Sequence, residues 1–206
     1  MRILFQGDSI TDCDRNRERD TLGDGYALMA AAELGRQEPG KYEFYNRAVS
    51  GDRVVDVYAR MKRDIWNLQP DYMTLLVGVN DVWHEIDFQN GVDAERYEKV
   101  YRMLLDDTRR ACPKTQIVLM EPYVLPGSAT RPNWEYFSSE VKARAAVVRK
   151  LAKEYDLPLI PLPGILEEAC KKAPPEYWLL DGVHPNLYGH RLIADAWIKK
   201  FRELNG

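Results

Sequence analysis

Residues Arg2 to Thr11 read RILFQGDSIT, a short apolar run that ends in a glycine turn and a serine. The run from Arg2 to Gln6 has the length and composition of a strand buried in a parallel sheet. Gly7 breaks the run, and Ser9 follows at once, so this stretch predicts a first strand that ends beside a hydroxyl group. Similar runs recur at Tyr42 to Asn46, Tyr72 to Val77, Gln116 to Met120 and Leu157 to Pro161.

Longer amphipathic stretches separate these runs, with apolar residues at helical spacing. They are Gly25 to Gly35, Val54 to Leu68, Ala94 to Ala111, Glu135 to Tyr155 and Leu187 to Leu204. Strands that alternate with helices pair in parallel through right-handed crossovers. The pattern predicts an α/β protein, a three-layer α/β/α sandwich with about five strands. With 206 residues, one domain over residues 1 to 206 is expected.

The composition narrows the classes of partner. Apolar residues make up 45% of the chain and charged residues 30%, as in globular proteins, and the net charge of −3 argues against binding to nucleic acid. No apolar run reaches the length of a membrane span or a signal peptide. Cys13, Cys112 and Cys170 lack CxxC spacing and predict neither a disulfide framework nor a zinc site. We expect a cytoplasmic protein with no membrane partner, metal or organic cofactor.

An acid and an imidazole lie three residues apart near the other end of the chain, at Asp181 and His184. A serine nucleophile needs a base that takes its proton, and the base needs an acid that orients it. Ser9, His184 and Asp181 can fill these roles, although a Gly-Asp-Ser triplet alone would also fit a helix cap. The other histidines, His84 and His190, lie in helical contexts and are expected to pack or to face solvent.

Acyl transfer also needs hydrogen-bond donors near the oxygen that becomes negative. After the second predicted strand, Gly51 can turn its backbone N–H toward a ligand. After the third, Asn80 can donate from its side-chain amide. Each alone is an ordinary turn residue. Parallel sheets bind ligands at the carboxyl edge of their strands, so Gly51 and Asn80 are expected beside Ser9.

Four short blocks follow one another along the chain. They are GDSIT at Gly7 to Thr11, NRAVSGD at Asn46 to Asp52, GVND at Gly78 to Asp81 and DGVHPN at Asp181 to Asn186. In order and spacing they resemble the SGNH (GDSL) hydrolase family. The resemblance implies a flavodoxin-like sheet in the order 2-1-3-4-5, a catalytic triad of Ser9, Asp181 and His184, and an oxyanion hole of Ser9, Gly51 and Asn80. No GxSxG motif occurs, which argues against the larger α/β-hydrolase fold.

Longer signatures point to a branch of that family. GDSITDC, NDVW and VHPN-x-x-GH are most similar to bacterial intracellular acetylxylan and carbohydrate acetyl esterases. This implies a serine esterase that removes acetyl groups from small esters such as acetylated xylo-oligosaccharides. A thioesterase or lysophospholipase with the same triad is the alternative, but that branch usually has small or aliphatic residues where this chain has Val82 and Trp83. A non-catalytic ligand-binding module is disfavoured, since it needs no nucleophile, base and acid together.

Aromatic rings near the crevice would suit a sugar, because pyranose C–H faces stack on rings. Trp83 and Tyr123 follow predicted strands and are candidate substrate contacts, together with Asp8 in the turn beside the nucleophile. No long apolar lid segment is visible, which favours a short acyl group. Symmetric assemblies are common among soluble proteins, so a homo-oligomer is a possible state of this chain.

Three acids near the nucleophile raise a different idea, a phosphoryl-transfer site built from Asp8, Asp12 and Asp14. The chain has no P-loop or equivalent lysine motif to hold a phosphate. We assign these acids to the turn and to a solvated loop instead.

Overall fold

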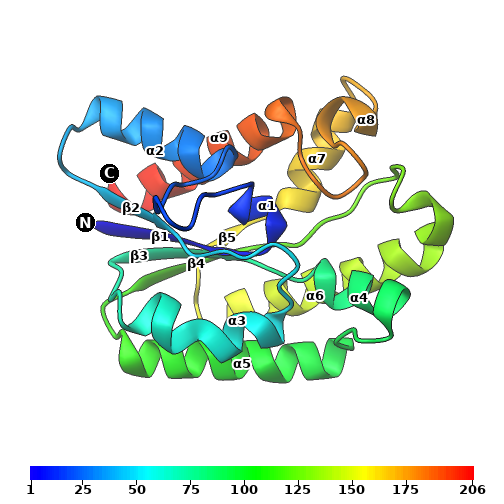
Figure 1. Ribbon diagram of the computed structural model, residues 1–206, viewed down its shortest axis with the longest axis horizontal. Helices are drawn as coiled ribbons and strands as arrows, with labels where there is room; N and C mark the ends of the chain where they lie inside the picture. The colour runs from blue at the N-terminus through cyan, green and yellow to red at the C-terminus, as the bar shows by residue number, and fades with distance from the viewer.

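A computed structural model describes residues 1–206, and its centre is one parallel sheet (Figure 1). The sheet has five strands in the order β2-β1-β3-β4-β5, which confirms the predicted fold class and strand order. Strand β1 lies inside the sheet, with Phe5 opposite Asn46 of β2 on one side and opposite Thr74 of β3 on the other. The strands are β1 (Arg2–Gly7), β2 (Glu43–Asn46), β3 (Tyr72–Leu76), β4 (Gln116–Met120) and β5 (Leu159–Ile160).

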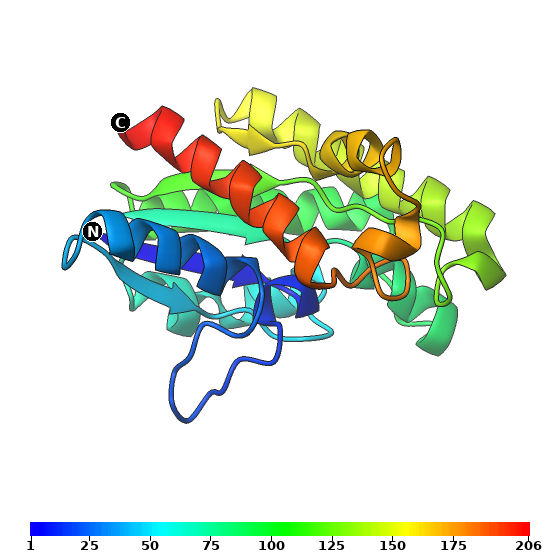
Figure 2. The same cartoon turned by 90° about the horizontal axis from the view of Figure 1, so that it is seen from above.

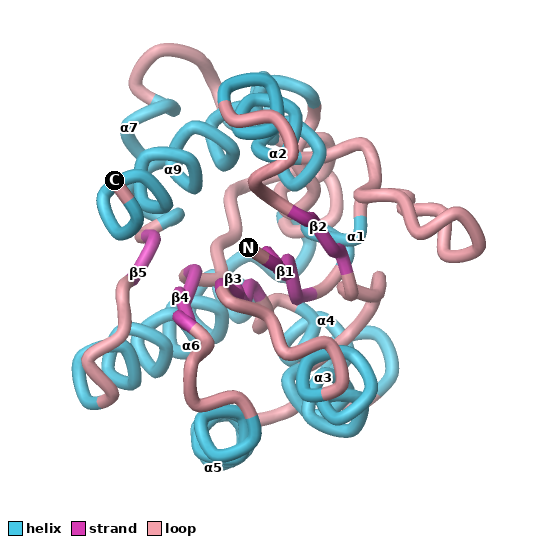
Figure 3. Tube along the Cα trace, turned by 90° about the vertical axis from the view of Figure 1, so that its left-hand side faces the viewer, coloured by secondary structure: helices cyan, strands magenta, loops and turns pink.

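Helices cover both faces of the sheet, because alternate residues of each buried strand point to opposite sides. Ile3 and Phe5 pack in one cluster under α2 (Tyr26–Gln37) and α9 (Leu187–Asn205). Leu4 packs in the other cluster. That second cluster lies against α3 (Val54–Met61), α5 (Ala94–Ala111) and the second half of α6 (Trp134–Glu154). Figure 3, seen along the strands, shows the sheet between these two helical layers.

Several helices and strands differ from the prediction in length or were not predicted, mostly because short elements leave little pattern in the sequence. The predicted strand at 157–161 shrinks to two residues, since prolines at 158 and 161 flank it and lack the N–H that a ladder needs. The predicted helix at 54–68 is α3 followed by a π-helical turn at Lys62–Trp66. Elements too short to show a clear period in sequence are α1 (Ser9–Asp12), α4 (Asn80–Phe88), η2 (Arg131–Asn133), α7 (Leu162–Cys170) and α8 (Pro175–Trp178). No helix is both long and apolar enough to cross a bilayer.

The carboxyl edge of the sheet gathers segments from both ends of the chain. Helix α1 starts two residues after β1 ends, and α4 starts four residues after β3 ends. Figure 2 shows α1, in dark blue, beside the turn that precedes α9, in orange. Residues near positions 9 and 184 are thus neighbours in space.

Gly7 is required where β1 meets β3. A Cβ atom placed on Gly7 would lie 2.1 Å from the carbonyl oxygen of Leu76, well inside van der Waals contact. That oxygen belongs to the backbone of the paired strand and cannot rotate away. Only glycine lets β1 run to its end beside β3 and deliver Ser9 to the sheet edge.

We predict that Gly7→Ala lowers the free energy of unfolding by about 1–3 kcal/mol, the usual cost of forcing extra atoms into a packed site. Urea unfolding followed by circular dichroism would measure it. Gly35→Ala is the matched control, because Gly35 lies in α2 with open space around its Cα. That change should be neutral or stabilising by up to about 1 kcal/mol. Equal stability of Gly7→Ala and the parent protein would contradict the packing argument.

Candidate active site

Ser9 is the first residue of α1 and lies two residues after the end of β1. The carboxylate of Asp8 caps this helix by accepting a hydrogen bond from the Ile10 N–H at 3.1 Å. Burial of Asp8, which is 1% exposed, raises its pKa to about 7, against the lowering effect of that hydrogen bond. The cap turns the chain sharply and leaves the Ser9 side chain only part-buried.

A tight loop positions Asp181 and His184. Leu179 and Pro185 form an antiparallel bridge, and the Leu180 N–H donates to the His184 carbonyl oxygen at 2.8 Å. Inside this loop, Asp181 Oδ1 accepts the backbone N–H groups of Val183 and His184, both at 2.8 Å. One carboxylate oxygen therefore shapes the loop while the other stays free to bind the imidazole.

The structure brings the three residues of the predicted triad into one hydrogen-bonded chain. Ser9 Oγ lies 2.8 Å from His184 Nε2, and His184 Nδ1 lies 2.7 Å from Asp181 Oδ2. A carboxylate only accepts, so Nδ1 carries the proton and Nε2 is free to accept from the serine hydroxyl.

Asp181 and His184 each shift the pKa of the other toward its charged form. The hydrogen bond to Asp181 raises the pKa of His184 above its ordinary 6.5, more than burial lowers it. Burial pushes the pKa of Asp181 upward, but hydrogen bonds from the His184 ring and from the backbone N–H groups of His184 and Val183 together lower it to about 2. Asp181 is thus anionic at neutral pH and favours the imidazolium form of His184.

Three donors at the sheet edge are free to bind an oxygen. No acceptor in the protein is bonded to the backbone N–H of Ser9 or of Gly51. Gly51 has a φ of +87°, a conformation that favours glycine. Asn80, the first residue of α4, donates one side-chain N–H to the Asp52 carbonyl oxygen at 3.2 Å and has a second to spare.

Asp81 is a residue of this region whose role the sequence interpretation missed. It is fully buried, and its two carboxylate oxygens accept the Val54 N–H at 3.1 and 3.2 Å. Burial raises its pKa to about 8, although the hydrogen bond from Val54 lowers it. Together with the bond from Asn80 to Asp52, this contact holds the Gly51 loop against the start of α4. Asp81 is the last residue of the GVND block, but its burial could not be inferred from that block.

The predicted substrate contacts are not equally placed. Trp83 is half-buried, and its ring centroid lies 5.8 Å from that of His184 and 5.7 Å from that of Phe137. The side chain of Tyr123 is only 2% exposed and its hydroxyl has no partner. Asp8 and Tyr123 are thus almost completely buried, whereas Trp83 keeps part of its surface exposed. That Asp8, Trp83 and Tyr123 contact substrate stays a prediction.

The two remaining histidines differ from each other. His190 is buried in α9, where Nδ1 accepts the Tyr26 N–H at 3.2 Å and Nε2 lies 3.3 Å from Cys13 Sγ. Burial lowers its pKa to about 4, so it is a neutral packing residue as expected. His84 lies in α4 near the site, with Nε2 4.0 Å from where a Cβ on Gly51 would be. No cluster of side chains in the structure has the make-up of a metal site.

Comparisons with known proteins agree with this geometry. The model of the GDSL-like lipase/acylhydrolase family matches residues 5–192. An acetylxylan esterase from Geobacillus stearothermophilus is 29% identical, over 97% of this chain and 93% of the relative. Thioesterase 1/protease 1/lysophospholipase L1 from Escherichia coli strain K12 is also 29% identical, over 90% of this chain and 81% of the relative.

Solved structures show the same fold. A protein from Parabacteroides merdae that is described as a GDSL-like lipase superposes with a TM-score of 0.92 at 37% identity, covering 97% of this chain and 94% of its own. A catalytic mutant of the Geobacillus stearothermophilus acetylxylan esterase superposes with a TM-score of 0.85 at 29% identity, covering 97% and 93%. Matched from its first strand to its last helix, this chain belongs to the GDSL-like lipase/acylhydrolase family and is a carboxylic ester hydrolase.

Proposed function

We propose that this acyl hydrolase removes acetyl groups from carbohydrate, such as acetylated xylo-oligosaccharides, through an acyl-enzyme on Ser9. The observation that carries the proposal is the hydrogen-bonded chain from Ser9 through His184 to Asp181, at 2.8 and 2.7 Å, beside unpaired N–H donors. Nucleophile, base, orienting acid and oxyanion donors are what serine-dependent acyl transfer requires.

The first half-reaction transfers the acyl group to the protein. Ser9 Oγ attacks the ester carbonyl carbon while its proton passes to His184 Nε2. The carbonyl oxygen becomes negative and is bound by the N–H groups of Ser9 and Gly51 and by the Asn80 amide. When the tetrahedral intermediate collapses, the C–O bond to the alcohol breaks and His184 returns the proton to the departing oxygen. Asp181 stabilises the imidazolium throughout.

The second half-reaction frees the enzyme. A water molecule gives its proton to His184 and attacks the acyl carbon. This forms a second tetrahedral intermediate, whose negative oxygen is bound by the same N–H donors. Collapse releases the carboxylic acid as the proton returns to Ser9 Oγ. His184 accepts and returns the proton in both steps.

The choice of acetylated sugar rests on Trp83 and on the relatives. A half-buried indole beside His184 offers an apolar face to a pyranose ring. The acetylxylan esterase aligns over more of this chain than the thioesterase does, 97% against 90%, at equal identity. The second candidate, a thioesterase or lysophospholipase, is favoured by that second relative alone.

Ser9→Ala should reduce the turnover of 4-nitrophenyl acetate by about three orders of magnitude or more, since it removes the attacking oxygen. Steady-state release of nitrophenolate would measure the change, with Ser139→Ala, an exposed serine in α6, as the control at parental rate. Substantial turnover by a folded Ser9→Ala protein would contradict Ser9 as the nucleophile.

The acid limb of kcat/KM should have its midpoint above pH 6.5, because His184 must be neutral to act as base and its pKa is raised by Asp181. Asp181→Asn removes the negative charge that favours the imidazolium, so the midpoint should move to lower pH while the rate falls by roughly 10³–10⁴. A pH–rate profile from pH 4 to 9 would test both effects.

Asp8 also has a pKa of about 7, so Asp8→Asn is the matched control for this profile. Persistence of the acid limb in that variant is expected if His184 is the base. An activity that stays flat down to pH 4 in the parent protein would exclude His184 from that role.

A series of acetyl, butyryl and octanoyl esters, with acetylated xylo-oligosaccharides, tests the substrate class. We expect kcat/KM to be highest for acetyl esters and acetate to be released from the oligosaccharides. Preference for octanoyl esters would favour the thioesterase candidate. Trp83→Ala should raise KM for the oligosaccharides by about 10-fold, the loss of one stacking contact, and change KM for 4-nitrophenyl acetate less.

A further inference from the structure

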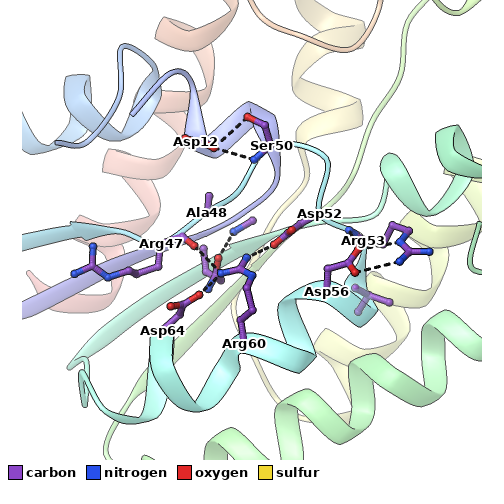
Figure 4. A network of polar contacts seen from close by, with 12 residues as sticks. Asp12, Arg47, Ala48, Ser50, Asp52, Arg53, Asp56, Arg60 and Asp64 are labelled. Atoms are coloured by element: carbon purple, nitrogen blue, oxygen red, sulfur yellow. Dashed lines mark hydrogen bonds and ion pairs between the residues drawn. The ribbon is translucent and has the colours of Figure 1, made fainter. Parts of the chain in front are cut away.

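The loop that carries Gly51 is held on both sides by buried charged groups (Figure 4). On one side, Asp12 Oδ2 accepts the Ser50 backbone N–H at 2.8 Å and the Ser50 hydroxyl at 3.1 Å. On the other side, the Asp52 carboxylate pairs with Arg60 of α3. Asp12 is 3% exposed, so the assignment of this acid to a solvated loop is wrong.

Asp12 also belongs to the nucleophile segment. Helix α1 is a single turn that begins at Ser9 and ends at Asp12. Its backbone is closed by hydrogen bonds from the Asp12 N–H to the Asp8 carbonyl oxygen at 2.8 Å and from the Cys13 N–H to the Ser9 carbonyl oxygen at 3.0 Å. The distance between the nucleophile and the carboxylate that holds Ser50 is therefore set by one closed turn.

Gly51 needs such an anchor because it has no side chain of its own to hold it. Its N–H belongs to the peptide plane that starts at the Ser50 carbonyl, and glycine leaves the following backbone angles free to change. Two hydrogen bonds to one carboxylate oxygen restrain both the backbone and the side chain of Ser50. Together with the turn in which the Asp52 N–H donates to the Val49 carbonyl oxygen at 3.1 Å, that restraint limits the direction of the Gly51 N–H.

We propose that Asp12 is a positioning residue that aims the Gly51 N–H at the oxyanion and ties it to the same turn as Ser9. The inference rests on the proposed function, in which Gly51 is an oxyanion donor. Asp12 touches neither substrate nor reacting atoms and acts through Ser50. Arg17, at 2.9 Å, and Arg15, at 3.7 Å, offset its buried negative charge. Arg15 also donates to the Ala48 carbonyl oxygen at 2.8 Å.

Asp12→Ala should lower kcat for 4-nitrophenyl acetate by about 10- to 100-fold, because a donor displaced by even 1 Å loses much of its effect in the transition state. KM should stay within about twofold, since the donor binds an oxyanion better than a ground-state carbonyl. Asp12→Asn keeps an oxygen that can accept the Ser50 N–H and should restore most of kcat. Ser50→Ala removes one of the two hydrogen bonds and should give an intermediate fall in kcat.

A boronic acid distinguishes positioning from general loss of structure, because it forms a tetrahedral adduct with a serine and places an oxygen among the donors. The inhibition constant of methaneboronic acid should rise across the variants in parallel with the fall in kcat. The pH midpoint should not move, because His184 and Asp181 are untouched. Arg17→Ala is the matched control: it removes an exposed partner of Asp12 and should change kcat by less than about threefold.

The proposal is overturned if folded Asp12→Ala retains kcat and boronate affinity within about twofold of the parent, or if Arg17→Ala loses as much as Asp12→Ala does. If Asp12→Ala does not fold, Asp12→Asn and Ser50→Ala decide: an unchanged kcat and boronate affinity in Ser50→Ala would overturn it. The two proposals fail in different variants. If Ser9→Ala is active, the proposed function is wrong. If Ser9→Ala is inactive but Asp12→Ala is fully active, only the positioning role of Asp12 is wrong.

Discussion

Parallel pairing of β1 between β2 and β3 is the interaction on which the rest of the structure depends. The ladder continues past the end of β2, because the Arg47 N–H donates to the Phe5 carbonyl oxygen at 3.0 Å and the Val49 N–H to that of Gly7 at 3.2 Å. The chain after β2 is thus carried along β1 until both reach the sheet edge. Ser9 leaves β1 two residues after Gly7, beside the loop that contains Gly51.

Buried acids extend this arrangement beyond the sheet. Burying a carboxylate is costly unless hydrogen bonds compensate it. Three acids at the carboxyl edge meet that condition by accepting backbone N–H groups: Asp8 from Ile10, Asp12 from Ser50 and Asp81 from Val54. The first shapes the nucleophile turn, and the other two bind the Gly51 loop to α1 and to α4. Segments that no strand pairs directly are thereby held at the spacing that an acyl-transfer site needs.

Much of the fold could be predicted from the sequence. The apolar runs and amphipathic stretches predicted a five-stranded α/β/α sandwich, and the family resemblance added the strand order, both of which the structure confirms. The same motifs predicted Ser9, Gly51, Asn80, Asp181 and His184. The structure joins Ser9, His184 and Asp181 by hydrogen bonds and places Gly51 and Asn80 in segments that follow β2 and β3. Their catalytic roles remain the proposal made above.

Burial could not be predicted in the same way. Asp12 and Tyr123 lie in stretches that resemble surface loops, yet both side chains are inside the protein. His84, expected to pack or face solvent, lies near Gly51 because four residues of helix bring it round from Asn80.

By itself the sequence determined the kinds of groups available and their attachment to strand ends, because hydrophobic period and turn residues act over a few neighbouring positions. Only the tertiary structure decided which of those groups are buried and which keep some exposed surface. That distinction between Trp83 and Tyr123, or between Ser9 and Asp12, depends on contacts among segments up to about 175 residues apart, as in the bond from Ser9 to His184. Local sequence preferences do not encode such contacts, since burial is a property of the packed whole.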